Sequence, residues 1–129
     1  MNSENLLKIS LLGGIAYFCC MSAAHFIGFK VPILFVYWDV PSFHYQDMII
    51  SFCAFTYACL FFAAFKHRAV LPAVLVAMAG TTLGLSAVNL SGDLQEKIEG
   101  ASTLAYWLQT GMIGGIGAWL GLLHLKAPN

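Results

Sequence analysis

Two histidines and two aspartates gather in one stretch of an otherwise apolar sequence, between His25 and Asp47. His25 lies near the end of the first apolar stretch, whereas Asp39, His44 and Asp47 precede the second one. Imidazole and carboxylate side chains can transfer protons or bind a metal ion. A metal site of the HExxH type fixes its ligands on one helix face, whereas a loop separates these residues, so we predict no metal site. His25 is the candidate catalytic residue, because ionisable groups inside a membrane span are usually functional. At its place near the outer boundary, the alternative is that it reaches head-group water or forms a hydrogen bond to a neighbouring helix.

Each apolar stretch also has polar side chains in one of its halves. These halves are predicted to lie toward the same side of a membrane. Residues three or four positions apart share a helix face, which groups Asp47 with Ser51 and Ser86 with Asn89. Converging faces of this kind form a polar cavity that opens on one side, and the other halves are nearly all apolar, which disfavours a continuous aqueous pore. The predicted ligand-binding residues are His25, Asp47, Ser51, Ser86, Asn89, Tyr106 and Gln109.

The elements that must position these residues follow from the composition. The chain has 129 residues, of which 60% are hydrophobic and 9% are charged, with a mean hydropathy of +0.79. Soluble domains carry about 25% charged residues, so we predict an integral membrane protein. Four apolar stretches approach the length of about 20 residues that a spanning helix needs, which predicts an all-α bundle of four transmembrane helices in a single domain, residues 1–129. The predicted spans are residues 6–29, 48–65, 71–90 and 103–125.

The basic residues divide unevenly between the two sides of such a bundle. The termini and the second connection share one side, which holds Lys8, Lys66, Arg68 and Lys126. The other side holds only Lys30 and Lys97. The positive-inside rule then places both termini in the cytoplasm, in a plasma or inner membrane. The formal net charge is zero, so there is no electrostatic argument for a nucleic-acid partner.

The first apolar stretch also has an alternative interpretation as a secretory signal. The residues Ser22-Ala23-Ala24 before His25 imitate a cleavage site. Glu4 in the leading segment and the hydrophobicity that resumes after His25 argue against cleavage. We therefore expect this stretch to remain as the first span.

Both connections on the outer side contain short segments that we place at the membrane interface. The first is proline-containing, and its Tyr37 and Trp38 suit the aromatic belt at the lipid boundary. Its Lys30 is expected to extend toward the head groups. In the second, Asp93 and Glu96 have the spacing of a helix capping box, which predicts a short interfacial helix.

Small residues recur at three- and four-residue spacing in the last two spans, which predicts that these helices pack closely together. Such stripes let backbones approach where lipid gives no hydrophobic drive for association. The same stripes suit a homo-oligomer or a partner in a membrane complex. They comprise Ala73, Ala77, Gly80, Gly84 and Ala87 in the third span and Gly111, Gly115, Ala118 and Gly121 in the fourth.

Four cysteines raise the question of redox chemistry, and none of them forms a CxxC motif. Cys20 and Cys53 fall at similar depths on neighbouring antiparallel spans, so a disulfide between them is geometrically allowed. Buried cysteines more often serve as small apolar packing residues, which is the interpretation that we prefer. The sequence has no Ser/His/Asp constellation and no glycine-rich phosphate loop, so no motif identifies an enzyme class.

The order of these features resembles that of the DoxX-like small membrane proteins. The first span ends in the polar, lysine-bearing segment AAHFIGFK, residues 23–30, and a proline-containing interfacial segment precedes the second span. The resemblance implies four spans and, as for some members of that family, an association with quinone-linked oxidoreductases or thiol-oxidative stress. It implies quinone as a cofactor and carries over no catalytic residue.

The sequence therefore predicts a small multi-pass membrane protein that binds an amphipathic ligand, a lipid or a quinone, in an outward-facing pocket. Polar residues would hold the polar end of the ligand, and phenylalanines of the first two spans its apolar part. An enzyme of this kind would be a quinone-linked oxidoreductase subunit in which His25 exchanges a proton with the quinone and Asp47 tunes it. Two alternatives are an oligomeric transporter of small solutes, which needs an inward-open state, and an assembly factor that recognises partner helices without a ligand.

Overall fold

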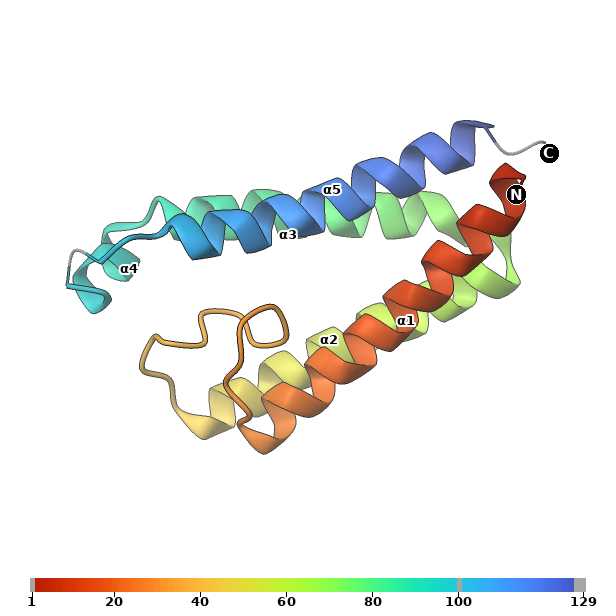
Figure 1. Ribbon diagram of the computed structural model, residues 1–129. Coiled ribbons are helices and arrows are strands. Elements are labelled where there is room, and N and C mark those ends of the chain that lie inside the picture. The colour runs from red at the N-terminus through yellow and green to blue at the C-terminus, as the bar shows by residue number, and fades with distance from the viewer. Residues whose placement is uncertain (1, 100, 127–129) are drawn as a thin grey trace.

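The computed structural model describes residues 2–99 and 101–126, and in those ranges it is built from helices without strands (Figure 1). Its elements in chain order are α1 (Ser3–Ile27), α2 (His44–Lys66), the short 3-10 helix η1 (Arg68–Val70), α3 (Leu71–Asn89), α4 (Gly92–Lys97) and α5 (Leu104–Lys126). The all-α prediction is confirmed, and each long helix covers most or all of one predicted span. The largest difference at a helix start is in α2, which begins at His44 instead of residue 48.

Local signals set the ends of α1 and the start of α3. Oδ1 of Asn2 accepts the backbone N–H of Asn5 at 2.9 Å, which caps the first turn of α1. α1 ends at Gly28, whose φ of 72° lies in the left-handed region that glycine adopts without steric cost. Pro72 lies in the first turn of α3, where its missing N–H removes no helical hydrogen bond.

The connection between α3 and α5 contains the predicted short helix, α4, but a different residue caps it. The hydroxyl of Ser91 accepts the backbone N–H of Leu94 at 3.3 Å. The capping box predicted at Asp93 and Glu96 is wrong, because the helix has already begun at Gly92 when the chain reaches Asp93. Leu94 is buried, so an apolar contact holds α4 against the rest of the molecule.

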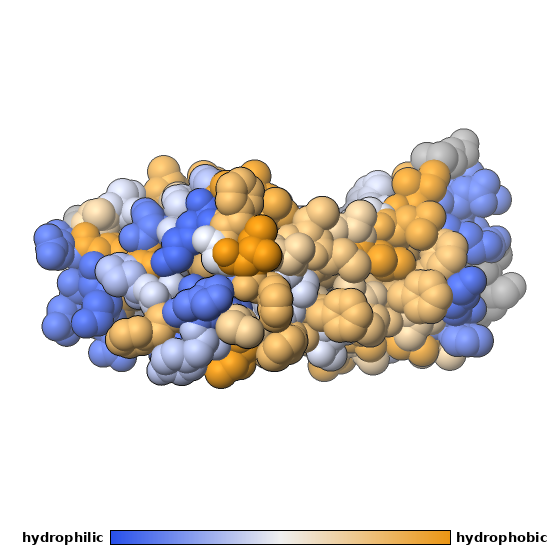
Figure 2. Space-filling model, turned by 90° about the horizontal axis from the view of Figure 1, so that it is seen from below, coloured by the Kyte–Doolittle hydropathy of each residue, from blue (hydrophilic) through white to orange (hydrophobic). Residues whose placement is uncertain are grey.

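In the part of the chain that the structure describes, three helical segments are long and apolar enough to cross a membrane: Ser3–Ile27, His44–Lys66 and Arg68–Asn89. α5 has 23 residues, the same number as α2. Figure 2 shows an apolar belt across the middle of the face in view, with hydrophilic residues at both ends. On α3, Val76 is 73% exposed and Leu83 is 72% exposed, and side chains of this kind suit contact with lipid better than contact with water.

The long helices form two pairs that meet at one end of the molecule (Figure 1). α1 packs along α2, and α3 packs along α5. Both ends of the described chain and η1 lie where the pairs meet, which we call the terminal end. At the opposite, loop end the pairs diverge, and residues 28–43 fold into the space between them. We call residues 28–43 the re-entrant loop.

The apolar core lies toward the terminal end. Phe61, Leu71, Val74 and Leu120 have no measurable exposure, at 0%, and come from α2, α3 and α5. Gly14 of α1 faces Phe61 so closely that a Cβ atom at this position would overlap the phenyl ring. Direct contact between the helix pairs thus fills the half of the bundle that was expected to be apolar.

α3 and α5 pack together as predicted, but mainly through other residues than the predicted stripes. Cβ atoms added at Gly114 and Gly117 of α5 would lie 3.1 Å from side-chain atoms of Thr82 and Met78, so these two glycines form the contact. Of the predicted α5 stripe, Gly121 faces α3, because a Cβ atom there would lie 3.9 Å from Leu75. The prediction is wrong for the stripe of α3, which turns larger side chains such as Met78 inward and most of its small residues outward. Outside its own helix, such a Cβ would meet nothing within 4 Å at Gly80, Gly84, Gly111 or Gly115.

The cysteines are free thiols, and all four of them are exposed: Cys19, Cys20, Cys53 and Cys59. No disulfide joins Cys20 to Cys53, and the predicted role of the cysteines as buried packing residues is wrong. α1 and α2 bury the neighbouring side chains of Phe18, Met21 and Ala54 instead, which turns the thiols to the outside of the pair.

Candidate functional site

His25 holds the backbone of the re-entrant loop at the point where α1 ends. Its Nε2 atom accepts the N–H of Val36 at 3.1 Å, and its ring stacks on Phe35 with centroids 3.9 Å apart. Because Nε2 accepts a hydrogen bond, the proton of the neutral ring is on Nδ1. Among the described residues Nδ1 has no hydrogen-bond partner, although His25 is 0% exposed. His25 is therefore a structural contact of the loop in this conformation.

Asn89 at the end of α3 holds the loop from the other helix pair. Its Oδ1 atom accepts the hydroxyl of Tyr37 at 2.9 Å, and its Nδ2 atom donates to Oγ1 of Thr110 at 3.0 Å. Burial raises the pKa of the Tyr37 hydroxyl to about 12, so this group remains a protonated donor at neutral pH. The hydroxyl of Tyr37 therefore points into the molecule, and the predicted place of this residue in an aromatic belt stays a prediction.

Two side chains of α5, Tyr106 and Gln109, also form hydrogen bonds to the loop. The hydroxyl of Tyr106 donates to Oδ1 of Asp39, and Nε2 of Gln109 donates to the carbonyl oxygen of Ile33 at 3.4 Å. The same carbonyl accepts the hydroxyl of Tyr17 from α1 at 2.8 Å. Non-helical backbone at membrane depth is tolerated where protein groups satisfy it, and these bonds supply such partners.

A chain of polar contacts joins the two ends of the re-entrant loop. Nζ of Lys30 donates to the hydroxyl of Ser42 at 2.8 Å, and that hydroxyl donates to Oδ2 of Asp47 at 3.0 Å. Lys30 therefore bonds within its own loop, and its predicted extension toward the head groups stays a prediction. Asp47 is 3% exposed and connects the loop to the first turns of α2.

The re-entrant loop carries backbone strain at two of its anchored residues. Ile33 has a φ of 74° and Tyr37 has a φ of 54°, both in the left-handed region. This region is unfavourable for a β-branched side chain such as that of Ile33. Strained backbone persists when surrounding contacts hold it. The carbonyl of Ile33 accepts a hydrogen bond from α1, and the hydroxyl of Tyr37 donates one to α3.

Five of the seven predicted ligand-binding residues contact the re-entrant loop: His25, Asp47, Asn89, Tyr106 and Gln109. The other two bond within their own helices. Ser51 donates to the carbonyl of Met48 at 2.6 Å, and Ser86 donates to that of Thr82 at 2.7 Å. The polar faces of the helices thus surround a segment of the chain itself.

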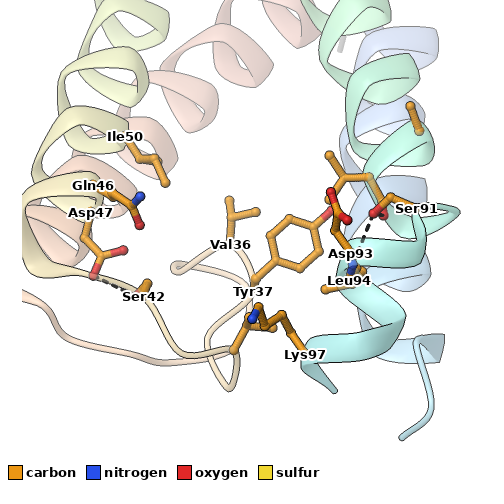
Figure 3. A pocket seen from close by; sticks show the side chains of 13 residues that line it. Val36, Tyr37, Ser42, Gln46, Asp47, Ile50, Ser91, Asp93, Leu94 and Lys97 are labelled. Carbon is orange, nitrogen blue, oxygen red and sulfur yellow. Dashed lines mark hydrogen bonds between the residues drawn. The ribbon is translucent and has the colours of Figure 1, made fainter. Parts of the chain in front are cut away.

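Next to the loop, a cavity of about 560 Å³ lies between α2 on one side and α3 with α4 on the other. Figure 3 shows Gln46, Asp47 and Ile50 on the α2 side and Ser91, Asp93 and Leu94 on the opposite side. Val36 and Tyr37 of the re-entrant loop lie between these walls (Figure 3). Of the seven predicted residues, Asp47 is the one that lines this cavity.

A second cavity of about 210 Å³ lies further along α2, toward the middle of the helices. Both are lined by Val36 and Ile50, and the second adds Cys53 and Tyr57, which lie one and two turns further along α2. We call the two cavities together the α2–α3 groove. Its mouth at the loop end carries amide, hydroxyl and charged groups, whereas its deeper part is largely apolar.

The residues that form the groove had no clear signal in the sequence. Ile50 and Val36 are ordinary apolar residues of a span and a connection, and Tyr37 resembles a residue of an aromatic belt. The one available indication was the first connection itself, because two prolines and sixteen residues between helices are more than a tight turn needs.

The described residues offer no obvious metal centre. Within residues 2–99 and 101–126, no three side chains of His, Cys, Asp or Glu come together in the way that a metal ion requires. His25 uses its Nε2 atom for Val36, and Asp39 accepts from Tyr106.

Removing the Tyr37 hydroxyl is expected to weaken the hold of α3 on the loop. In Tyr37→Phe, Oδ1 of Asn89 loses its donor from the loop, and the free energy of unfolding should fall by about 1 kcal/mol. Amide exchange of residues 33–40 should accelerate at the same time. Tyr45→Phe is the matched control, because Tyr45 is 61% exposed, and equal effects of both substitutions would contradict the assigned role.

Comparison of the chain with protein-family models, with curated proteins and with solved structures gives no match. The resemblance to DoxX-like proteins gains no support from them and stays a prediction.

Proposed function

We propose that this chain is a four-span integral membrane protein that binds a small amphipathic molecule, a lipid or a quinone, in the α2–α3 groove. Polar groups at the first cavity and a largely apolar lining of the second, with Val36 and Ile50 lining both, support this proposal. Ligand sites are typically mostly apolar, with a few polar groups that orient the ligand, and have volumes of about 300–1,000 Å³. A head group would lie near Asp47 and Gln46, and an apolar chain would extend past Ile50 toward Tyr57.

The charge distribution supports an orientation with both termini in the cytoplasm. Basic residues concentrate at the terminal end, where we place Lys8, Lys66, Arg68 and Lys126. By the positive-inside rule this end is cytoplasmic, and the groove then opens to the outer side of a plasma or inner membrane. α5 supplies the fourth span.

The groups at the mouth favour a neutral or zwitterionic head group. Asp47, Asp93 and Lys97 all line the mouth, so both signs of charge are present. An anionic head group would meet two carboxylates against one ammonium, which is electrostatically unfavourable. A quinone carbonyl or a zwitterionic lipid head group can instead accept from Gln46 or Lys97.

The binding proposal does not use His25 for proton transfer. The ring of His25 stacks on Phe35 and is fully buried, and His25 does not line the groove. Its predicted catalytic role remains a prediction that requires the loop to move.

Filling the groove tests the proposal directly. Ile50 lines both cavities, so the larger side chain of Ile50→Trp should fill space in both. Ile49→Trp places the same bulk at a residue that is 57% exposed and outside the groove. We expect native mass spectrometry of the gently extracted wild type to show a retained lipid or quinone. The Ile50→Trp protein should lose at least 90% of it, and the Ile49→Trp protein should retain it. Equal retention by both variants would refute the groove as the binding site.

A further inference from the structure

The hydrogen bond that anchors the re-entrant loop at His25 requires a neutral imidazole ring. Nε2 of His25 accepts the backbone N–H of Val36 at 3.1 Å, and a peptide N–H can only donate. A protonated imidazole carries an N–H group on each ring nitrogen and has no acceptor left. Protonation of His25 would therefore turn this contact into two donors that face each other.

The surroundings of the ring also suit an uncharged group while the loop is docked. His25 is 0% exposed, and its ring stacks on Phe35 with centroids 3.9 Å apart. Among the described residues, Nδ1 has no hydrogen-bond partner. An imidazolium in this place would have two buried N–H groups without acceptors, which is costly where water is excluded. Docking of the loop thus selects the neutral form of His25.

Charged and titratable groups face this site from the neighbouring elements. Asp47 of α2 interacts electrostatically with the ring, and His44, the first residue of α2, lies against the end of α1. On the loop, Nζ of Lys30 lies 5.5 Å from the centroid of the phenyl ring that stacks on His25. α3 carries no charged side chain, and the titratable group that α5 brings to the loop is Tyr106. An imidazolium that formed here would have the carboxylate of Asp47 as its counter-charge.

We propose that His25 is a proton-binding site that controls the docking of the re-entrant loop. With the loop docked, the ring is neutral and holds the N–H of Val36. When the loop undocks, the ring is exposed to head-group water, because it lies two residues before the end of α1, and Nε2 takes up one proton from that water. Redocking returns the proton to the water. Low pH at the loop end therefore favours the undocked loop.

Backbone strain in the loop acts in the same direction. Ile33 and Tyr37 both have φ angles in the left-handed region, and undocking lets them relax. The contacts of the docked loop must therefore offset this strain, and the hydrogen bond to His25 is one of them. Loss of that bond on protonation leaves the strain less well opposed.

The sign and the size of the effect follow from the linkage between proton binding and undocking. The undocked state binds one proton more than the docked state. The contribution of His25 to docking is therefore complete above the pKa of a freely exposed histidine, about 6.5, and is lost as the pH falls below that value. Undocking becomes about tenfold more favourable for each pH unit there, which amounts to about thirtyfold between pH 7.5 and pH 5.

Hydrogen exchange of the delipidated full chain in detergent, between pH 7.5 and pH 5, tests the site. The readout is the protection factor of the Val36 amide, in which the intrinsic pH dependence of exchange cancels. We expect it to fall about thirtyfold across this range. Protection of the Val74 amide in the core of α3 should stay constant. Constant protection at Val36, or an equal loss at Val74, would overturn the proposal.

Two histidine variants identify the group that binds the proton. His25→Gln retains a side-chain acceptor but does not titrate, so Val36 should keep part of its protection at pH 7.5 and lose the pH dependence. His44→Gln removes the exposed histidine beside the loop and should leave the thirtyfold effect unchanged. Persistence of the full effect in His25→Gln would assign it to another group, such as Asp47, and would refute the role of His25.

NMR of the histidine side chains gives a second readout on the wild type, which needs no variant to fold. At pH 7.5 the ring of His25 should carry its proton on Nδ1 and none on Nε2. The ring should become doubly protonated over the same pH range in which Val36 loses protection. A ring that stays neutral while the loop is released would contradict the proposal.

The same coupling should reach the α2–α3 groove, and this step rests on the proposed function. Val36 lines both cavities, so undocking removes part of the wall. A lipid or quinone that native mass spectrometry finds on the wild type at pH 7.5 should be lost at pH 5 and retained by His25→Gln. The two proposals can fail separately. Acid release of the loop in a protein that retains no such molecule at pH 7.5 would refute the groove alone, whereas retention with a pH-independent loop would refute the proton site alone.

Discussion

Gly14→Ala is expected to destabilise the protein by about 1–3 kcal/mol, the typical cost of overpacking a well-packed core. The added methyl group would overlap the ring of Phe61. The ring has no room to yield, because Phe61 is 0% exposed and also contacts Phe18 with centroids 5.2 Å apart. α1 and α2 must therefore separate. Thermal or denaturant unfolding in detergent measures the effect.

Gly13→Ala is the matched control for this prediction. A Cβ atom at Gly13 meets nothing within 4 Å outside its own helix, so the same substitution one residue earlier adds a methyl group without a clash. Alanine also has the higher helix propensity, so Gly13→Ala should be neutral or slightly stabilising. The Gly14→Ala/Phe61→Leu double variant should recover part of the lost stability, because leucine removes the ring atoms that clash. No recovery would show that the loss does not arise at this contact.

The second large effect is expected at His25, where His25→Phe should release the re-entrant loop. Phenylalanine retains a ring against Phe35 but offers no acceptor to the N–H of Val36. A buried N–H group without a partner costs about 1–3 kcal/mol. Hydrogen exchange at the Val36 amide and proteolysis of residues 28–43 should both accelerate. The long helices should remain, as circular dichroism would show.

Two further substitutions define this effect. His44→Phe makes the same change at an exposed histidine beside the loop and should leave exchange at Val36 unaltered. His25→Gln retains a side-chain acceptor and should preserve part of the protection. Unchanged exchange at Val36 in His25→Phe would mean that the hydrogen bond does not hold the loop.

The helices could be predicted because their signal is local and strong. Any stretch of about 20 apolar residues is long enough to cross a bilayer. The predicted spans therefore begin and end within a few residues of the observed bounds of α1, α2, α3 and α5. The inward direction of His25, Asn89 and Gln109 could also be predicted, since polar groups are costly against lipid.

The rotation of the helices and the path of the loop could not be predicted. A helix that is apolar all round has no preferred face, so the sequence did not show that α3 turns Gly80 and Gly84 outward. The loop depends on contacts from α1, α3 and α5 to Ile33, Val36 and Tyr37, which are distant in sequence. The polar residues were therefore assigned to a ligand, whereas in the structure five of them hold the loop.

The strained loop has a thermodynamic consequence for any molecule that enters the groove. Val36 and Tyr37 form part of the groove wall, so a ligand that needs this wall binds only while the loop is docked. By mass action, such a ligand opposes undocking by RT ln(1 + [L]/Kd). Exchange of the loop amides would then slow in proportion to ligand concentration. Hydrogen exchange of the loop amides therefore indicates how much of the groove is occupied. Candidate lipids and quinones can be ranked by how much they slow exchange at the Val36 amide.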